Sequence, residues 1–241
     1  MKFNKPNGDR WESSIKFKIS SLVVLPKGSI MPQIFGFELN GQDKCPYCGQ
    51  RLQSVGLIAA GREAKPAKWP WHSALFYVES NKLAYKCGAT VIRDNVVLTA
   101  AHCVTKNNQS LSEKIFKIRI VQGDLLSASS YDSNVYRSNI HENYDYQTFE
   151  NDIALLTLES KITFTTQIQP ICLSSPDLKY KNLGVAVGFG STEKSTDHSS
   201  VLREVEIPIV NSEVCHDSDP DFFGSHLFPG NFCAGQVGVQ K

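Results

Sequence analysis

The chain has 241 residues, and its 25 Lys and Arg against 24 Asp and Glu give a formal net charge of +1. This nearly neutral balance gives no electrostatic reason to expect binding to nucleic acid or to a charged membrane surface. The hydrophobic content of 41% supports a globular core, and no apolar run approaches the roughly 18 residues that a membrane span needs. We therefore expect a globular protein of one or two domains, with no nucleic-acid partner and no membrane span.

Residues 1–44 are interpreted as a linker or the remnant of an upstream module. They include one half-buried strand, in which Ile15, Phe17 and Ile19 alternate with lysines. The first residues contain no apolar core of about 7–15 residues, so they do not form a signal peptide. Seven cysteines nevertheless indicate an oxidising compartment. We therefore expect an extracellular, secreted protein whose natural N-terminus lies upstream of Met1.

Two cysteines, Cys45 and Cys48, form a Cys-Pro-Tyr-Cys motif. This motif is compatible with half a zinc site or with a redox pair. Zinc would need a second cysteine pair or a close histidine pair, and redox chemistry would need a thioredoxin-like βαβ context; neither follows in the sequence. We expect no metal and no cofactor, and we keep a metal-binding scaffold of these cysteines and scattered histidines as a separate hypothesis.

A possible general base stands at the end of a short apolar strand. The strand, residues 96–99, leads through two alanines into His102, although a lone histidine there is more often structural. About 50 residues later, Asp152 stands at the start of another apolar strand, where a buried carboxylate needs a donor. The imidazole N–H of His102 is a natural partner. That pairing would fix the tautomer and leave the other ring nitrogen free to take a proton from a hydroxyl.

Two motifs carry a family resemblance. Thr99-Ala100-Ala101-His102-Cys103 and Asn151-Asp152-Ile153-Ala154-Leu155 together resemble the chymotrypsin-like (trypsin-type) serine endopeptidases, in which they hold the catalytic histidine and aspartate. The resemblance covers about residues 45–235. It implies an all-β fold of two six-stranded β-barrels, with the protease domain over residues 58–241. It also implies protein substrates, an activating protease and, as a further possible partner, a serpin-type inhibitor.

The resemblance assigns residues 45–57 to a linker and activation segment. Leu57-Ile58-Ala59-Ala60-Gly61 corresponds to the family's activation site, so cleavage after Leu57 would convert a zymogen and create a new amino group on Ile58. The family usually has Arg or Lys at the position of Leu57, and the substitution implies an activator that prefers an apolar residue. Without the resemblance, this stretch is an ordinary strand entry of small residues.

Three disulfides follow from the same resemblance, and they leave Cys45 unpaired. The implied pairs are Cys48–Cys172, Cys87–Cys103 and Cys215–Cys233. Independently of the family, Asn108-Gln109-Ser110 is the one Asn-x-Ser/Thr triplet in the chain and makes Asn108 a candidate glycosylation site in a polar loop. A further histidine, His141, is expected to be a surface residue and not a second catalytic base.

The family pattern stops after Gly235, because the remaining residues to Lys241 do not include the Gly-Asp-Ser-Gly-Gly-Pro segment. In the family, that segment supplies the serine nucleophile and the oxyanion donors. Loss of the serine alone costs about 10⁶-fold in kcat. We therefore expect residues 1–241 to be truncated before the catalytic serine and inactive, with an incomplete second barrel. The alternative is a non-catalytic homologue that acts as a binding or decoy protein.

Overall fold

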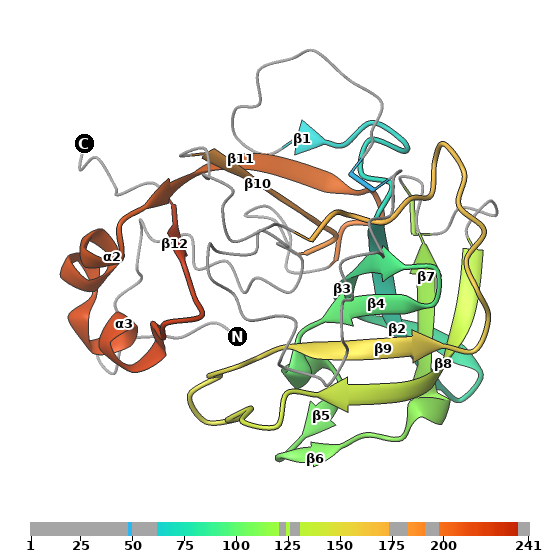
Figure 1. Ribbon diagram of the computed structural model, residues 1–241, viewed down its shortest axis with the longest axis horizontal. Coiled ribbons are helices and arrows are strands. Elements are labelled where there is room, and N and C mark those ends of the chain that lie inside the picture. The colour runs from blue at the N-terminus through green and yellow to red at the C-terminus, as the bar shows by residue number, and fades with distance from the viewer. Residues whose placement is uncertain are drawn as a thin grey trace.

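The computed structural model describes residues 48–49, 62–120, 124–125, 131–173, 183–190 and 198–235 (Figure 1). The predicted activation site at Leu57–Ile58, the strand at residues 15–19 and Cys45 lie outside these ranges. Strands dominate the described part. In chain order the elements are β1 (Arg62–Glu63), β2 (His72–Glu79), β3 (Lys82–Arg93), β4 (Val96–Thr99), η1 (Ala101–Cys103), β5 (Thr105–Lys106), β6 (Gln109–Ser110), η2 (Glu113–Ile115), β7 (Phe116–Ile120), β8 (Tyr131–Ile140), β9 (Ala154–Leu158), β10 (Leu183–Gly188), β11 (Arg203–Val210), α2 (Ser212–Ser218), α3 (Pro220–His226) and β12 (Cys233–Ala234).

Six strands close into a barrel in the order β2-β3-β4-β9-β8-β7, with every neighbouring pair antiparallel. β7 illustrates the pattern that builds it, because Phe116, Ile118 and Ile120 are buried while the intervening Lys117 and Arg119 are half-buried. Alternating side chains of a strand point to opposite faces, so one face of each strand fills the barrel interior. Closure leaves the barrel no unpaired edge.

A second sheet lies beside the barrel. β10 and β11 pair along their length, β1 joins β11 at Arg203 and Glu204, and β12 joins it at Ile209 and Val210. This sheet has four strands and does not close into a barrel within the described residues. The all-β, chymotrypsin-like fold predicted from the sequence is confirmed, with one closed six-stranded barrel and, among the described residues, a four-stranded second sheet.

The second sheet contacts the barrel through an apolar cluster. Phe189, which follows β10, is fully buried in this cluster with Phe76 of β2 and Leu202. Trp69, just before β2, belongs to the same cluster. The second sheet therefore packs on the outer face of β2 through this apolar cluster.

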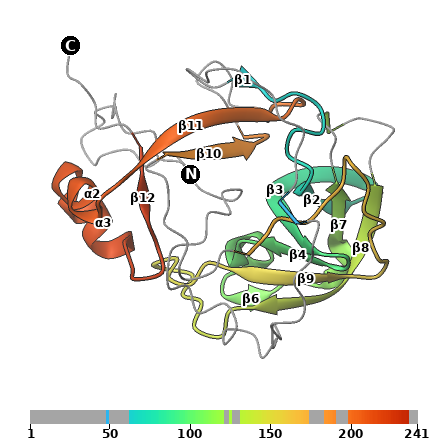
Figure 2. The same cartoon turned by 45° about the horizontal axis from the view of Figure 1, so that its top comes forward.

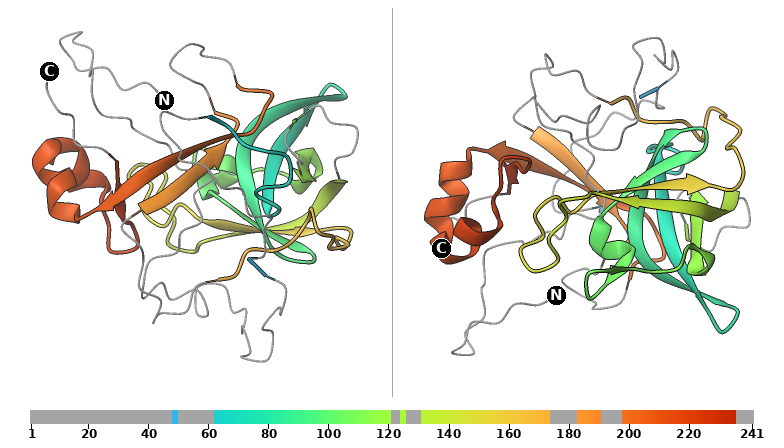
Figure 3. Two further views of the ribbon diagram at one scale, coloured as in Figure 1. Left: turned by 90° about the horizontal axis from the view of Figure 1, so that it is seen from above. Right: turned by 60° about the horizontal axis from the view of Figure 1, so that its bottom comes forward.

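Two short helices, α2 and α3, were not predicted from the sequence. Asn211 accepts a hydrogen bond from the Glu213 amide at the start of α2, and Asp219 does the same for Phe222 in α3. These are N-cap signals, with Pro220 in the first turn of α3 as a further one. The views in Figures 1, 2 and 3 agree that both helices lie at the end of the second sheet distant from the barrel. Within the described ranges, no helix combines the length and apolar character needed to cross a membrane.

Candidate active site

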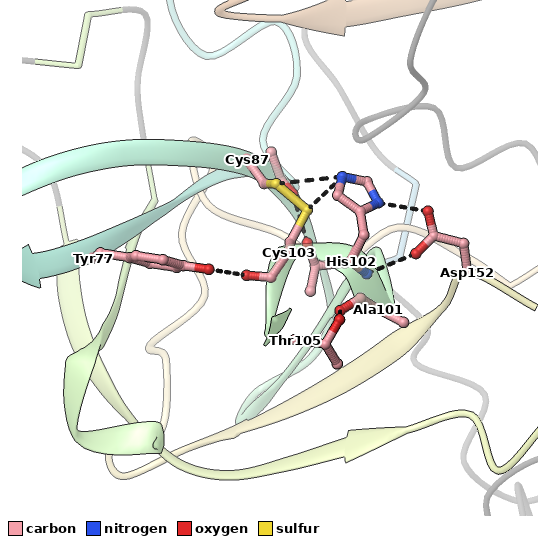
Figure 4. The surroundings of a disulfide bond; sticks show 9 residues. Tyr77, Cys87, Ala101, His102, Cys103, Thr105 and Asp152 are labelled. Atoms are coloured by element: carbon pink, nitrogen blue, oxygen red, sulfur yellow. Dashed lines mark hydrogen bonds and ion pairs between the residues drawn. A yellow bond between two sulfur atoms is a disulfide. The ribbon is translucent and has the colours of Figure 1, made fainter. Parts of the chain in front are cut away.

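His102 lies on η1, a single 3₁₀ turn that follows β4 directly. All four residues of β4 are buried, and Ala101 is fully enclosed, so the turn packs tightly at the barrel end. Three further contacts hold it, as Figure 4 shows: the Cys87–Cys103 disulfide, the Tyr77 hydroxyl donating to the Cys103 carbonyl, and the Thr105 hydroxyl donating to the Ala101 carbonyl. The backbone that carries the imidazole is therefore fixed on both sides.

Asp152 reaches His102 because their strands are neighbours. β4 pairs with β9, with Thr99 opposite Ala154, so the residues just after β4 and just before β9 meet at one end of the barrel. Asp152 Oδ2 lies 2.5 Å from His102 Nδ1, and Oδ1 accepts a hydrogen bond from the His102 backbone amide at 2.8 Å. One carboxylate thus orients both the ring and the main chain of the histidine.

The pair is only partly open to solvent, with 14% of the His102 side chain and 22% of the Asp152 side chain exposed. When Nδ1 carries the proton that Asp152 accepts, Nε2 has a lone pair. Nε2 lies 3.3 Å from Cys103 Sγ and 4.0 Å from Cys87 Sγ. These bonded sulfurs carry no hydrogen and cannot donate to it. The arrangement therefore suits Nε2 to accept a proton from a hydroxyl group.

Comparisons with known proteins bear on this geometry. The sequence model of the family described as Trypsin matches residues 58–241. The chain belongs to the trypsin family. It is 34% identical over 182 residues to the proclotting enzyme of Tachypleus tridentatus. The aligned region covers 71% of this chain and 48% of that relative. It is 32% identical over 235 residues to transmembrane protease serine 11A of Homo sapiens. This aligned region covers 94% of this chain and 53% of that relative.

A third relative is the clotting factor G beta subunit of Tachypleus tridentatus, 32% identical over 177 residues, or 71% of this chain and 56% of the relative. The chain spans about half the length of each of these trypsin-family relatives. Family membership indicates a serine-protease hydrolase domain.

A cluster of possible metal ligands coincides with this site. Ligand atoms of Cys87, His102 and Cys103 lie within 4.8 Å of one another. Zinc is bound by thiolates, and here the two sulfurs are bonded to each other, so neither is available as a ligand. The chemistry of this donor set therefore favours a disulfide that supports the histidine turn over a zinc centre.

The structure joins the cysteines in the three pairs that the resemblance implied. Their Cα–Cα distances are 4.9 Å for Cys48–Cys172, 6.2 Å for Cys87–Cys103 and 6.5 Å for Cys215–Cys233. The first pair connects the linker segment to the chain after β9, and the third ties α2 to β12. The other sequence-derived site residue within the described ranges, Asn108, is exposed in the turn between β5 and β6.

One expectation about this region was wrong. His141 was predicted to lie on the surface, but it is only 9% exposed. Its backbone amide donates to the Ile153 carbonyl, and its Nδ1 accepts from the Asn143 amide at 3.1 Å. One of these bonds joins the histidine to the residue that follows Asp152, and the other is local. The polar sequence around His141 gave no sign of this burial.

Phe149 is a second residue that sequence reasoning missed. It belongs to the loop between β8 and β9, and its ring stands edge-on to the His102 imidazole with a centroid distance of 6.0 Å. It adopts a positive φ of 61°, which a phenylalanine rarely does outside a constrained turn. The aromatic ring therefore stands beside the imidazole as one wall of the site.

A buried carboxylate, Glu204 on β11, forms another unpredicted cluster where the second sheet meets the barrel. Its oxygens accept hydrogen bonds from Lys68 Nζ at 2.7 Å, Trp69 Nε1 at 2.7 Å and Arg62 Nε at 2.9 Å. Burial by itself would raise the pKa of Glu204, but these donors together bring the pKa below its ordinary value. The cluster joins β1 and the segment before β2 to β11.

Proposed function

We propose that this chain is the protease part of a serine endopeptidase, in which His102 is the general base and Asp152 orients it. The observation that supports this most directly is the 2.5 Å contact between His102 Nδ1 and Asp152 Oδ2, in a member of the trypsin family. In the proposed reaction, Nε2 takes the proton of the attacking serine hydroxyl. Asp152 stabilises the resulting imidazolium, which then gives the proton to the leaving amine.

The test is hydrolysis of peptide substrates by the natural protein after activation. His102→Ala is expected to abolish the activity. The matched control is His216→Ala, because His216 is exposed on α2, and this variant should retain the activity. Equal hydrolysis by the parent protein and by His102→Ala would reject the proposed role of the histidine.

The polypeptide of residues 1–241 taken alone is proposed to be inactive. The His102–Asp152 pair can activate a serine only if that serine is present. The family's Gly-Asp-Ser-Gly-Gly-Pro segment, which carries the serine, is not part of these residues. A serine-hydrolase phosphonate probe should therefore leave purified 1–241 unlabelled, and a stable adduct would contradict the proposal. If the natural protein also fails to hydrolyse peptides or react with the probe, the competing function is favoured: a non-catalytic homologue that binds an activator or inhibitor.

Activation is proposed to occur by cleavage between Leu57 and Ile58, so that the chain behaves as a zymogen. β1 begins at Arg62, four residues after Ile58, and the Glu204 cluster anchors it to the second sheet. This anchoring supports a role in which only the first few residues of the new N-terminus are free to rearrange. Digestion with a protease that prefers apolar residues, followed by N-terminal sequencing, should give Ile-Ala-Ala-Gly. A trypsin-like activator should not produce this sequence.

An extracellular location is proposed because three disulfides suit an oxidising compartment. Protein substrates, an activating protease and a serpin-type inhibitor are the proposed partners, and the likeness to a proclotting enzyme supports a place in a proteolytic cascade. Detection of the natural protein in the extracellular fluid, with its cysteines oxidised, is the expected result. Retention inside the cell in a reduced form would contradict it.

A further inference from the structure

The hairpin that follows the histidine turn carries the chain's one Asn-x-Ser/Thr triplet. β5 and β6 form two residue pairs, Thr105 with Ser110 and Lys106 with Gln109. The two residues between them, Asn107 and Asn108, have φ values of 51° and 61°. Positive φ at both central positions is the mark of a type I′ turn, the tightest way to join two strands. Asn108 is exposed at the tip of this turn.

The hairpin is held firmly to the structure that carries His102. The Thr105 hydroxyl donates to the Ala101 carbonyl at 3.0 Å, and the Leu111 amide donates to the Val104 carbonyl at 2.9 Å. Leu111 also packs against the barrel core. Two strand residues reach only about 7 Å, so the tip stays close to the histidine turn. A group attached to Asn108 would therefore start from a tip held, through two strand residues, to the turn that carries His102.

We propose that Asn108 carries an N-linked oligosaccharide and that this sugar shields the hairpin side of the His102–Asp152 pair from macromolecules. The donor is an oligosaccharide on a lipid diphosphate. The Asn108 amide nitrogen bonds to the sugar C1, the bond from C1 to the diphosphate oxygen breaks, and one amide proton is released. The modification itself is independent of catalysis; its role in controlling access rests on the proposed function.

The chain contains a matched hairpin without the triplet. β2 and β3 are joined by Ser80 and Asn81, whose φ values of 49° and 62° repeat the geometry of the first turn. Asn81 is exposed as well, but Leu83 stands where a sequon needs Ser or Thr. Leu83 is 39% exposed, so Leu83→Thr should be tolerated and should create a second sequon in an equivalent turn.

The modification is tested on the full chain secreted from eukaryotic cells with an added leader. The parent protein and Asn107→Gln should lose the mass of one oligosaccharide on treatment with peptide N-glycosidase, whereas Asn108→Gln and Ser110→Ala should lose none. The Leu83→Thr variant should lose the mass of two oligosaccharides. If Leu83→Thr carries sugar on Asn81 while the Asn108 peptide is unmodified, the proposal is overturned, because the cells and the turn geometry are then shown to permit glycosylation.

Shielding is tested by the size dependence of acylation at Lys106, the exposed lysine in the same hairpin. A small acylating ester should modify Lys106 equally in the parent protein and in Asn108→Gln. A large polyethylene glycol ester should react several-fold more slowly with the parent. Lys82, at the matched hairpin, should show no difference between the two proteins. Equal rates for the large ester at Lys106 would overturn shielding, and neither measurement depends on hydrolytic activity.

Discussion

The barrel and the second sheet are stabilised in different ways. The barrel encloses a continuous apolar core in which Leu75, Ile118 and Leu156 are completely buried. In β10 and β11 only Gly184, Glu204 and Ile207 are buried, and α2 and α3 bury no residue at all. The His102–Asp152 pair belongs entirely to the barrel, since β4 and β9 position it. Its geometry therefore depends on apolar packing, whereas the second sheet is joined to the barrel by a smaller apolar cluster together with the buried Glu204 ion cluster.

The largest expected effect comes from removing the centre of that cluster. Glu204→Ala leaves Lys68 buried without its counter-charge, and loss of one member of a buried ion pair costs about 3–5 kcal/mol. Hydrogen exchange should accelerate in β1 and β11 and remain slow in β4 and β9. Glu206→Ala, at a half-buried position on the same strand, is the control and should change little. Equal acceleration in the barrel would show that the two regions are not separately stabilised.

Truncation in the barrel core should have a similar or slightly smaller cost. Leu156→Ala creates a cavity at a fully buried site and should lower the free energy of unfolding by about 2–5 kcal/mol. Val205→Ala, at a half-buried position on β11, should lose less, about 1 kcal/mol. Chemical denaturation of both variants measures the difference. If both variants lose the same free energy of unfolding, the barrel core is not packed more tightly than the second sheet, and the contrast between the two regions is wrong.

Acid should weaken the junction between the two regions, where His72 of β2 lies. Burial lowers the pKa of His72 from 6.5 to about 4, and the centroid of its ring lies 5.5 Å from that of Phe189, just after β10 of the second sheet. The unfolded chain takes up this proton near pH 6.5, but the folded chain does so only near pH 4. Stability is therefore complete above pH 6.5 and is lost as the pH falls towards 4, by about 3 kcal/mol in total.

Denaturant unfolding at pH 7 and at pH 4.5 measures this loss. His72→Gln has no proton to take up, so its stability should change much less between the two pH values than that of the parent protein. Identical changes in the two proteins would rule out His72 as the cause. Glu204 adds a separate loss in more acidic solution, because its pKa is below the ordinary value of 4.5 and its stabilisation disappears only as the pH falls through that lower pKa.

The smallest expected effect concerns the helices at the far end of the second sheet. Asn211→Ala removes the side chain that caps α2 and should cost about 1 kcal/mol locally. Hydrogen exchange in α2 should become faster, with no change in the barrel. Asp217→Ala, exposed on the same helix, provides the control. A change that extends into β4 would indicate coupling between regions that this structure keeps apart.

The sequence was most informative where the structure follows local patterns. The alternation in β7 and the apolar stretch of β4 predicted strands because side-chain direction alternates along the strand itself. The His102 and Asp152 motifs were recognisable because each is contiguous in the chain, and the structure brings the two residues together.

Other features depend on residues distant in sequence. The Glu204 cluster joins partners more than 130 residues apart, and nothing in the alternation of β11 identifies one of its glutamates as buried. The buried position of His141 likewise involves another segment, because its backbone amide donates to the carbonyl of Ile153, just before the neighbouring strand β9. Helices α2 and α3 were missed for the opposite reason. Each has only seven residues, too few to show a clear helical period, so their caps were the only available signal.

The pairing of β4 with β9 brings together two residues, His102 and Asp152, that are far apart along the chain. Some fifty residues connect His102 to Asp152, yet their relative position is set by the register that aligns Thr99 with Ala154. The loops between them can therefore gain or lose residues without displacing the His102–Asp152 pair. The barrel thus fixes the contact between these two side chains independently of how long the loops between them are.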